Sequence, residues 1–344
     1  MNSAACGGSI RRLPGNRINH VLTQPLRVGE FPQPSPSLRI GDRGRMVGRV
    51  VEIANDGRHL AVDRGFLTVA EQGAEVGRVP LDDLAAVIAN AHGLTYSNNL
   101  LVTLAARGVP IVLCGANHRP AAIVWPVDGH HAQAGRMSDQ ARASAPLKKR
   151  LWQQIVQAKI LAQGAALASI GAEAGGFRLL ARKVRPGDLG NVEAEAARRY
   201  WPLMLGGDFR RDHDGGGLNG LLNYGYTILR AATARAVMAA GLHPSLGLMH
   251  SNRGNALVLV DDLMEPFRPV VDREVHRLKG SGITEVEREA KAALARVMVT
   301  DLPVDEGVSP VMTCLERLAG SLAKAYAGEI DRLVLPRPSL PLGF

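Results

Sequence analysis

Residues 47–63 read VGRVVEIANDGRHLAVD and decide the fold of the N-terminal part of the chain. Two short apolar-rich stretches, 47–53 and 59–63, lie on either side of the turn residues Asn55-Asp56-Gly57. Apolar runs of about four to eight residues that are separated by an Asp-Gly turn favour a β-hairpin over a helix. We therefore predict that these two stretches form neighbouring strands.

The same pattern of short strands continues as far as residue 126. Turn residues separate the stretches, and Ser97 is placed to begin a single helix between two of them. We predict a small β-rich domain over residues 46–126. Its further strands are expected at residues 66–70, 78–81, 85–89, 111–114 and 121–125.

The chain becomes helical after a polar, glycine-bearing stretch at residues 127–143, which we interpret as a linker. Leu147, Leu151 and Ile155 then recur at helical spacing. The sequence thus predicts an α+β protein, in which the small β-rich N-terminal domain is followed by a larger all-α domain over residues 144–338. Further helical patterns cover residues 191–205, 218–241, 262–278, 283–299 and 309–328.

The first 45 residues differ from the rest of the chain. They hold five of its 20 prolines and seven arginines, against only Glu30 and Asp42, so that they carry +5 of the formal net charge of +9. A basic, proline-rich segment without periodicity is typical of a disordered leader. Two alternatives stay open, namely an arm that grips DNA and a true start of translation at Met46.

The composition of the 344-residue chain excludes several classes of protein. Hydrophobic residues make up 46%, which is too many for wholesale disorder. The apolar runs are far shorter than the ~20 residues of a membrane span, so we expect a cytoplasmic protein. Three scattered cysteines, Cys6, Cys114 and Cys314, exclude a disulfide framework and a cysteine zinc site. The excess of 41 basic over 32 acidic residues favours a polyanionic partner.

No motif for a protein nucleophile, a phosphate-binding loop or a zinc protease occurs in the sequence. Asn191 is suited to cap a helix whose first turn carries Glu193 and Glu195, and this interpretation of the glutamates is purely structural. Glu193, however, adjoins the apolar face of that helix. A carboxylate at such a place needs a partner, and a metal ion is one such partner.

Two further groups could contribute to a metal site. His250 follows an apolar stretch and is either a structural hydrogen-bonding residue or a ligand. Asp262 and Glu265 have the spacing of a capping box, but residues at i and i+3 also share one face of a helix and could converge on one ion. Carboxylates with one imidazole suit Mg²⁺ or Mn²⁺. The run 210–217, RRDHDGGG, is interpreted as a mobile loop whose two arginines could contact phosphates.

The helical domain contains the strings EAEAARRYW at 193–201, LNGLLNYGY at 218–226, GLHPSLGLMH at 241–250 and DLMEPFRP at 262–269. In this order, the four strings resemble the universal CRISPR adaptation integrase family. Residues 48–53 and 79–83 also match its N-terminal domain, so that the resemblance runs from about residue 46 to about residue 338. The EPFRP and LNYGY portions resemble the type II branch and, within it, subgroup II-C.

The resemblance implies a β-rich N-terminal domain and an all-α catalytic domain. It also implies a metal-dependent DNA endonuclease and integrase of antiviral defence in bacteria. In the family's reaction, the 3′-hydroxyl ends of short duplex DNA, the new spacers, are joined to the edge of a CRISPR repeat by transesterification. This reaction needs no protein nucleophile, in agreement with the absence of any such motif.

The family's metal triad falls on Glu193, His250 and Glu265, with Mg²⁺ or Mn²⁺ as the implied cofactor. Glu193 is favoured over Glu195 because only Glu193 fits the spacing to the following Ala-Ala-Arg and Tyr. The residue after the catalytic glutamate is often glycine in the family, and here it is Ala194. A methyl group on a helix should be tolerated.

Asp262 and Asn219 fall on auxiliary positions. Contacts to the DNA backbone require arginine or lysine, and the aromatic content of 4% argues against a protein that binds single strands by base stacking. The candidates for backbone contacts near the site are Arg198, Arg199, Arg210, Arg211 and Arg253, with Lys148, Lys149 and Arg150 on the first long helix.

The resemblance also implies partners. They are double-stranded DNA (the spacer precursor and the CRISPR repeat), a second copy of the chain in a homodimer, and a smaller CRISPR adaptation subunit in a heterohexamer. The type II effector nuclease is a further implied partner. Two alternatives stay open, namely a non-catalytic DNA-binding scaffold of the same fold and a stand-alone integrase of a mobile element.

Overall fold

The structure is a computed structural model that describes residues 49–115, 120–127, 129–251 and 254–337. The proposed leader at residues 1–45 and the candidate Arg253 lie outside the described residues. The described residues belong to one compact unit, which contains both the β-rich and the helical part. Among the described helices, none combines the length and the apolar character that crossing a membrane requires.

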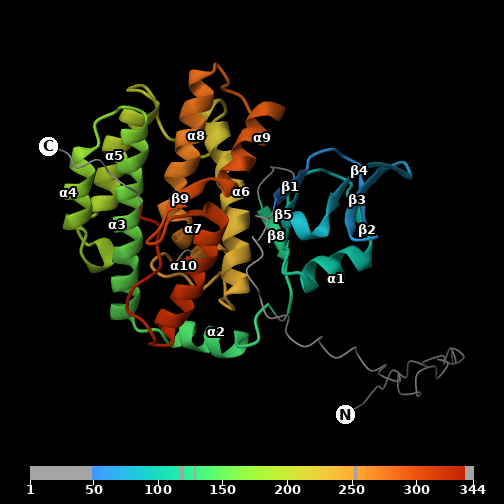
Figure 1. Ribbon diagram of the computed structural model, residues 1–344, viewed down its shortest axis with the longest axis horizontal. Helices are drawn as coiled ribbons and strands as arrows, with labels where there is room; N and C mark the ends of the chain where they lie inside the picture. The colour runs from blue at the N-terminus through green and yellow to red at the C-terminus, as the bar shows by residue number, and fades with distance from the viewer. Residues whose placement is uncertain (1–48, 116–119, 128, 252–253, 338–344) are drawn as a thin grey trace, which may run out of the picture. The chain divides into compact units, whose positions relative to one another are not determined.

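The first sheet has the strand order β1-β5-β7-β8 (Figure 1). Its central strand β5 is a continuous apolar run, LAAVIA, that is buried along its whole length. Such a run is typical of a strand covered on both faces. β5 pairs in parallel with β1 and β7, and β7 pairs antiparallel with β8. The strands are β1 (Arg49–Ile53), β5 (Leu84–Ala89), β7 (Ile111–Cys114) and β8 (Pro120–Val124).

The second sheet has the order β4-β3-β2-β6. It is formed by β2 (His59–Asp63), β3 (Phe66–Glu71), β4 (Ala74–Pro80) and β6 (Thr95–Tyr96). The helix expected after Ser97 is present as α1 (Asn98–Ala106), and the Ser97 hydroxyl accepts a hydrogen bond from the Leu100 amide at 3.2 Å. The 3₁₀ turn η1 (Leu81–Asp83) connects β4 to β5.

The predicted hairpin between residues 47–53 and 59–63 is wrong, because β1 and β2 belong to different sheets. β2 pairs instead with β3 across Arg64-Gly65, and both turn residues have positive φ. Two-residue turns with positive φ at both positions match the twist of a hairpin. The Asp56-Gly57 turn is tied elsewhere, since the Asp56 carboxylate accepts a hydrogen bond from the His92 amide at 2.8 Å.

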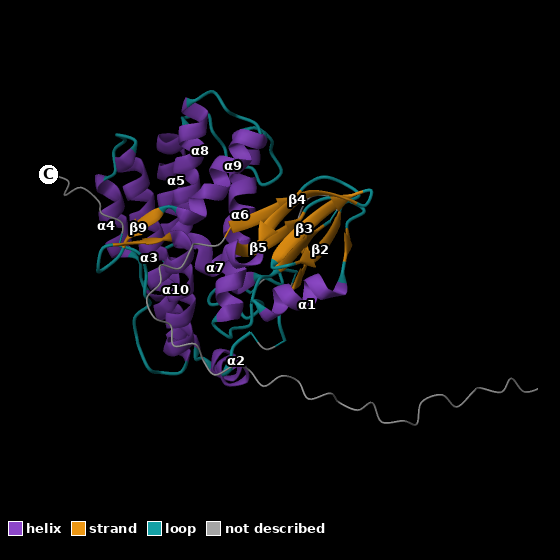
Figure 2. Ribbon diagram, turned by 45° about the vertical axis from the view of Figure 1, so that its right-hand side comes forward, coloured by secondary structure: helices purple, strands orange, loops and turns teal. Residues whose placement is uncertain are grey.

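The helical part is organised around α6, which packs against α7, α8, α9 and α10 and also against β1 and β5 of the first sheet (Figures 1 and 2). The predicted helical patterns are confirmed, although the 262–278 pattern is divided by a 3₁₀ turn. The elements are α3 (Ala145–Ser169), α4 (Gly175–Lys183), η2 (Pro186–Asp188), α5 (Val192–Leu205), α6 (Leu218–Ala239), α7 (Val258–Met264), η3 (Glu265–Phe267), α8 (Arg268–Gly280), α9 (Arg288–Arg296), η4 (Val297–Val299) and α10 (Val311–Tyr326).

Part of the predicted linker is a helix, α2 (Gln133–Arg142). Its polar side chains satisfy backbone groups of the segment that follows α6. The buried Gln140 amide donates to the carbonyls of His243 and Leu246 at 2.9 Å each, and its oxygen accepts from the His243 amide at 2.8 Å. The polar residues at 127–143 therefore include a helix that binds the segment after α6, and they do not form a linker alone.

The prediction that the second domain is all-α is wrong in one detail. β9 (Asp301–Pro303) and β10 (Val308–Pro310) form a two-stranded antiparallel pair between α9 and α10. The turn between them depends on Gly307, which has a φ of +86° and whose carbonyl accepts a hydrogen bond from the Val304 amide at 3.1 Å. The strands are too short to give a periodic signal in the sequence.

Candidate active site

Glu193 lies in the first turn of α5, but the predicted cap of this helix is wrong. Asn191 adopts a left-handed conformation with φ of 50° and makes no side-chain cap. The Asp188 carboxylate replaces it, because its two oxygens accept hydrogen bonds from the amides of Val192 and Glu193 at 3.0 Å each. Glu195 turns to the surface and pairs with Arg199 at 2.5 Å. Glu193 is therefore the glutamate of this helix that points towards α3.

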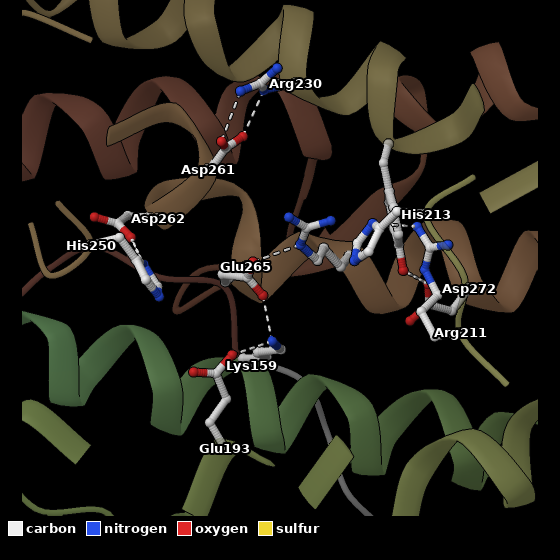
Figure 3. A network of polar contacts seen from close by, with 12 residues as sticks. Lys159, Glu193, Arg211, His213, Arg230, His250, Asp261, Asp262, Glu265 and Asp272 are labelled. Carbon is white, nitrogen blue, oxygen red and sulfur yellow. Dashed lines mark hydrogen bonds and ion pairs between the residues drawn. The ribbon is translucent and has the colours of Figure 1, made fainter. Parts of the chain in front are cut away.

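Lys159 on α3 joins Glu193 to Glu265 (Figure 3). Its Nζ lies 2.5 Å from Glu193 Oε1 and 2.5 Å from Glu265 Oε2. The exposed fractions of the side chains are 13% for Lys159, 25% for Glu193 and 13% for Glu265. Burial lowers the pKa of Lys159, but the charges of the two glutamates outweigh it and the pKa is raised.

Lys159 is not among the site residues predicted from the sequence. The helical pattern does indicate this lysine. Trp152, Ile155 and Val156 define the buried face of α3, and Lys159, three positions after Val156, lies on the same face. A lysine where the helical pattern calls for an apolar residue is almost always paired when it is buried.

Glu265 begins the turn η3 and is held from two sides. Its Oε1 accepts a hydrogen bond from Arg268 Nε at 2.7 Å, while Oε2 faces Lys159. Burial would raise the pKa of Glu265, but the positive charges of Arg268 and Lys159 lower it to about 2. Glu265 Oε2 is buried, and the ion pair with Lys159 is its contact among the described residues.

His250 is oriented by Asp262, which is fully buried in α7. Asp262 Oδ2 accepts hydrogen bonds from the amides of Leu248 and Met249 at 2.8 Å and 3.1 Å, and Oδ1 lies 2.5 Å from His250 Nδ1. The hydrogen bond to Asp262 raises the pKa of His250, partly opposed by burial. The capping-box interpretation of Asp262 and Glu265 is therefore wrong. A carboxylate on Nδ1 leaves Nε2 as the nitrogen of His250 that can ligate.

Gly247 allows the backbone of residues 247–250 to form a tight turn. A Cβ at position 247 would lie 2.4 Å from the His250 carbonyl oxygen and 2.5 Å from Val258 Cγ1, which are distances that real side chains do not adopt. On the other side of the ring, Trp152 contacts His250 edge-on with centroids 5.1 Å apart. The GLMH string is thus a tight turn that fixes the imidazole from its backbone.

These donors fit a hard divalent cation. Two carboxylates and an imidazole whose second nitrogen is held by a carboxylate form a donor set typical of such ions. Within the described residues, no three acidic, histidine or cysteine side chains form a ready-made cage. Lys159 stands between the two glutamates.

A cleft with a volume of about 990 Å³ opens beside His250 and Glu265. Three guanidinium groups from α8, α6 and the loop before α6 line it, namely Arg268, Arg230 and Arg211. Arg230 is paired with Asp261 at 2.7 Å, whereas Arg268 and Arg211 lie over the Tyr226 ring, with Cζ atoms 4.6 Å and 5.5 Å from its centroid. A wall of this kind is suited to phosphates.

A larger cavity of about 1400 Å³ lies against another face of α3, between Arg150, Arg317 and Lys324. It contains none of the candidate metal ligands. The smaller cleft is lined by two of the three candidate ligands, His250 and Glu265, and Glu193 lines neither cavity.

The loop that was expected to be mobile is tied to α6. Arg211 donates to the side-chain oxygens of Asn219 at 3.1 Å and Asn223 at 2.6 Å, and Asn219 donates to the Arg210 carbonyl at 3.0 Å. Burial lowers the pKa of Arg211, and the nearby charge of Arg268 contributes in the same direction. Asn219 thus anchors the loop that presents Arg211 to the cleft.

The predicted backbone-contacting arginines are not all near the cleft. Arg211 lines it. Arg198 is exposed on α5, and Arg199 is exposed and paired with Glu195. Arg210 is exposed and donates to the carbonyls of Gly207 and Phe209. Arg268 and Arg230, which line the cleft, were not among the candidates.

Comparison with known proteins places this geometry in context. The family model described as "CRISPR associated protein Cas1" matches residues 51–301. The CRISPR-associated endonuclease Cas1 of Neisseria meningitidis is 37% identical over 291 residues, which are 83% of this chain and 94% of that protein.

Two solved structures share the fold. The structure described as a casposase bound to integration product has a TM-score of 0.70 at 18% identity, covering 83% of this chain and 92% of that chain. A chain of a Cas6-RT-Cas1–Cas2 complex has a TM-score of 0.64 at 19% identity, covering 86% of this chain and 36% of that chain.

Proposed function

Because the chain belongs to the Cas1 family of CRISPR-associated endonucleases and integrases, we propose that it inserts new spacers into the CRISPR array in the bacterial cytoplasm. The reaction joins the 3′-hydroxyl ends of short duplex DNA to the edge of a repeat by transesterification. The observation that carries the proposal is that Glu265 and an oriented His250 line a cleft with three arginines, while Glu193 meets Glu265 through Lys159.

The proposed cofactor is Mg²⁺ or Mn²⁺, held by the carboxylates of Glu193 and Glu265 and by His250 Nε2. Bound there, such an ion would lower the pKa of the attacking hydroxyl and stabilise the negative charge that develops on the phosphate. The role of Asp262 is to hold His250 in the tautomer with a free Nε2, which makes it a positioning residue.

The residues of the cleft have a separate task, which is to hold the DNA. Arg268 and Arg211 flank the Tyr226 ring and are placed to contact phosphates next to Glu265. Contacts of this kind position the DNA without reading its sequence. We propose Arg268 as a phosphate contact in addition to Arg211, and a duplex as the form of DNA that is bound.

The proposed partners follow from the same relatives. The structural neighbours include a casposase bound to integration product and a Cas1–Cas2 assembly. They support DNA and Cas2 as partners of this chain. From the family resemblance, we further propose that the chain forms a homodimer that joins the smaller Cas2 subunit in a heterohexamer. We assign the chain to the type II branch, subgroup II-C, from its EPFRP and LNYGY portions, and propose the effector nuclease of that branch as a further partner.

The test is a strand-transfer assay with the full chain and Cas2. A short duplex with free 3′-hydroxyls is incubated with a supercoiled plasmid that carries a repeat, with Mn²⁺ or Mg²⁺. We expect Glu193→Gln to abolish metal-dependent joining, and Glu195→Gln, its surface neighbour on α5, to retain it. Joining that survives in Glu193→Gln contradicts the proposed site. Tight duplex binding by the wild type without any joining favours the scaffold alternative.

A further inference from the structure

Lys159 gives the two candidate carboxylate ligands a shared partner. Its Nζ is 2.5 Å from one oxygen of each glutamate, and all three side chains are largely shielded from water. Glu193 lies on α5 and Glu265 on η3, and the amine of Lys159 on α3 contacts both (Figure 3).

The ammonium has a clear electrostatic purpose. Without it, two carboxylates would face each other in a region of low dielectric constant, where like charges repel strongly. Arg268 neutralises only Glu265, because it contacts Oε1 of that residue. Glu193 has Lys159 as its ion-pair partner among the described residues.

A divalent ion cannot share this position with the ammonium. Mg²⁺ binds carboxylate oxygens at about 2.0–2.1 Å. Because Nζ already lies 2.5 Å from one oxygen of each glutamate, an ion held by these oxygens would compete with the ammonium for the same space. Arg268 contacts the other oxygen of Glu265 and can stay. Lys159 is therefore the group that has to leave.

We propose that Lys159 is a resident cation of the active site, which holds Glu193 and Glu265 together before metal binding and is displaced when the metal binds. This inference rests on the proposed metal role of the two glutamates. It makes Lys159 a positioning residue whose ammonium competes with the divalent ion for the same two oxygens.

The first test measures Mn²⁺ binding to the full chain, by titration calorimetry or by the electron paramagnetic resonance of free Mn²⁺. Lys159→Met keeps the length of the side chain and removes the competing charge. We expect this variant to bind Mn²⁺ at least about tenfold more tightly than the wild type, because a charge-assisted hydrogen bond is worth a factor of about 10 to 100. Lys183→Met, on the exposed side of α4, is the matched control and should bind as the wild type does.

The second test follows the displacement directly in the wild type, so that it stays valid if Lys159→Met does not fold. Lysines are labelled with an amine-reactive reagent, with and without Mn²⁺, and the labelled positions are quantified by mass spectrometry. We expect labelling of Lys159 to increase severalfold with Mn²⁺, while labelling of Lys183 stays constant.

The outcomes separate this inference from the proposed function. Equal or weaker Mn²⁺ binding by a folded Lys159→Met, or unchanged labelling of Lys159 when the wild type is loaded with Mn²⁺, would overturn the resident-cation role alone. Failure of both the wild type and Lys159→Met to bind Mn²⁺ would overturn the metal site itself, and the resident-cation role with it.

Discussion

Replacing Asp262 by asparagine tests how His250 is prepared to bind a metal ion. One oxygen of Asp262 accepts hydrogen bonds from the amides of Leu248 and Met249, and the other lies 2.5 Å from His250 Nδ1. In the neutral ring, a carboxylate accepts the Nδ1 proton and leaves the lone pair of Nε2 free. The two backbone amides are donors that cannot change their role.

Asparagine has only one oxygen with which to meet these three partners. Its oxygen remains with the two backbone amides, and its NH₂ group then faces His250 Nδ1. Nδ1 has to accept this hydrogen bond, so the neutral ring carries its proton on Nε2. The nitrogen that would bind the metal has then lost its free lone pair, although the side chains keep their shape and the fold is retained.

The expected loss of metal affinity and activity follows from two kinds of site in which a carboxylate orients a histidine. Loss of the partner that orients a metal-binding histidine costs about 10- to 100-fold in metal affinity or activity. The same Asp-to-Asn exchange beside a catalytic histidine costs about 10⁴ in kcat when it enforces the wrong tautomer. We expect Asp262→Asn to bind Mn²⁺ about 10- to 100-fold more weakly, and strand transfer to fall by at least that factor.

The assay combines Mn²⁺ titration and strand transfer with nitrogen NMR of the histidine ring at a pH at which the ring is neutral. Asp208→Asn, an exposed residue just after α5, is the control for loss of a carboxylate. A folded Asp262→Asn that binds Mn²⁺ as the wild type does, with an unprotonated Nε2, would refute the reasoning. Weak binding with an unprotonated Nε2 would refute the tautomer as its cause.

Two further substitutions test the packing behind the cleft. In Gly225→Ala the new Cβ would lie 2.5 Å from Val271 Cγ1. The cost of overpacking, about 1–3 kcal/mol, should exceed the gain in helix propensity of about 1 kcal/mol. We therefore expect a lower Tm, which adding Val271→Ala should partly restore, and an unchanged Tm would contradict this. Burial raises the pKa of Asp272 from 3.8 to about 6, although hydrogen bonds from two tyrosines oppose it. The native state therefore keeps this proton where the unfolded chain has lost it, and the contribution to stability falls by about 3 kcal/mol as pH rises from about 4 to about 6. Asp272→Asn should remove this fall from the unfolding free energy measured with denaturant, and an equal slope in variant and wild type would contradict the assignment.

The positions of most strands and helices could be predicted, because they depend on local patterns. Residues 84–89 form a run whose burial on both faces is visible in the sequence. The pairing of the strands could not be predicted from local patterns. β1 lies beside β5, more than 30 residues further along the chain, and no local signal distinguishes this partner from the adjacent β2. The helix at residues 133–142 escaped prediction because its contacts are polar.

The candidate ligands could be predicted from the resemblance, but not the way in which they are held. Asp262 has the spacing of a capping residue, yet its partners Leu248, Met249 and His250 lie on a loop 12 to 14 residues earlier. Lys159 precedes Glu193 by 34 residues, and only the packing of α3 against α5 brings the two together. Both relationships depend on tertiary structure, which the spacing along the chain does not contain.

The two cations at Glu265 have different consequences for the same carboxylate. Arg268 contacts Oε1 from three residues away on the next helical turn, whereas Lys159 contacts Oε2 from a separate helix. Together they hold the pKa of Glu265 at about 2, so this proposed ligand stays ionised without any metal. If a metal replaces Lys159 at Oε2, Arg268 still neutralises the carboxylate from the other side. A buried carboxylate can therefore exchange one cationic partner for another without being left unpaired. This exchange requires that different residues contact its two oxygens.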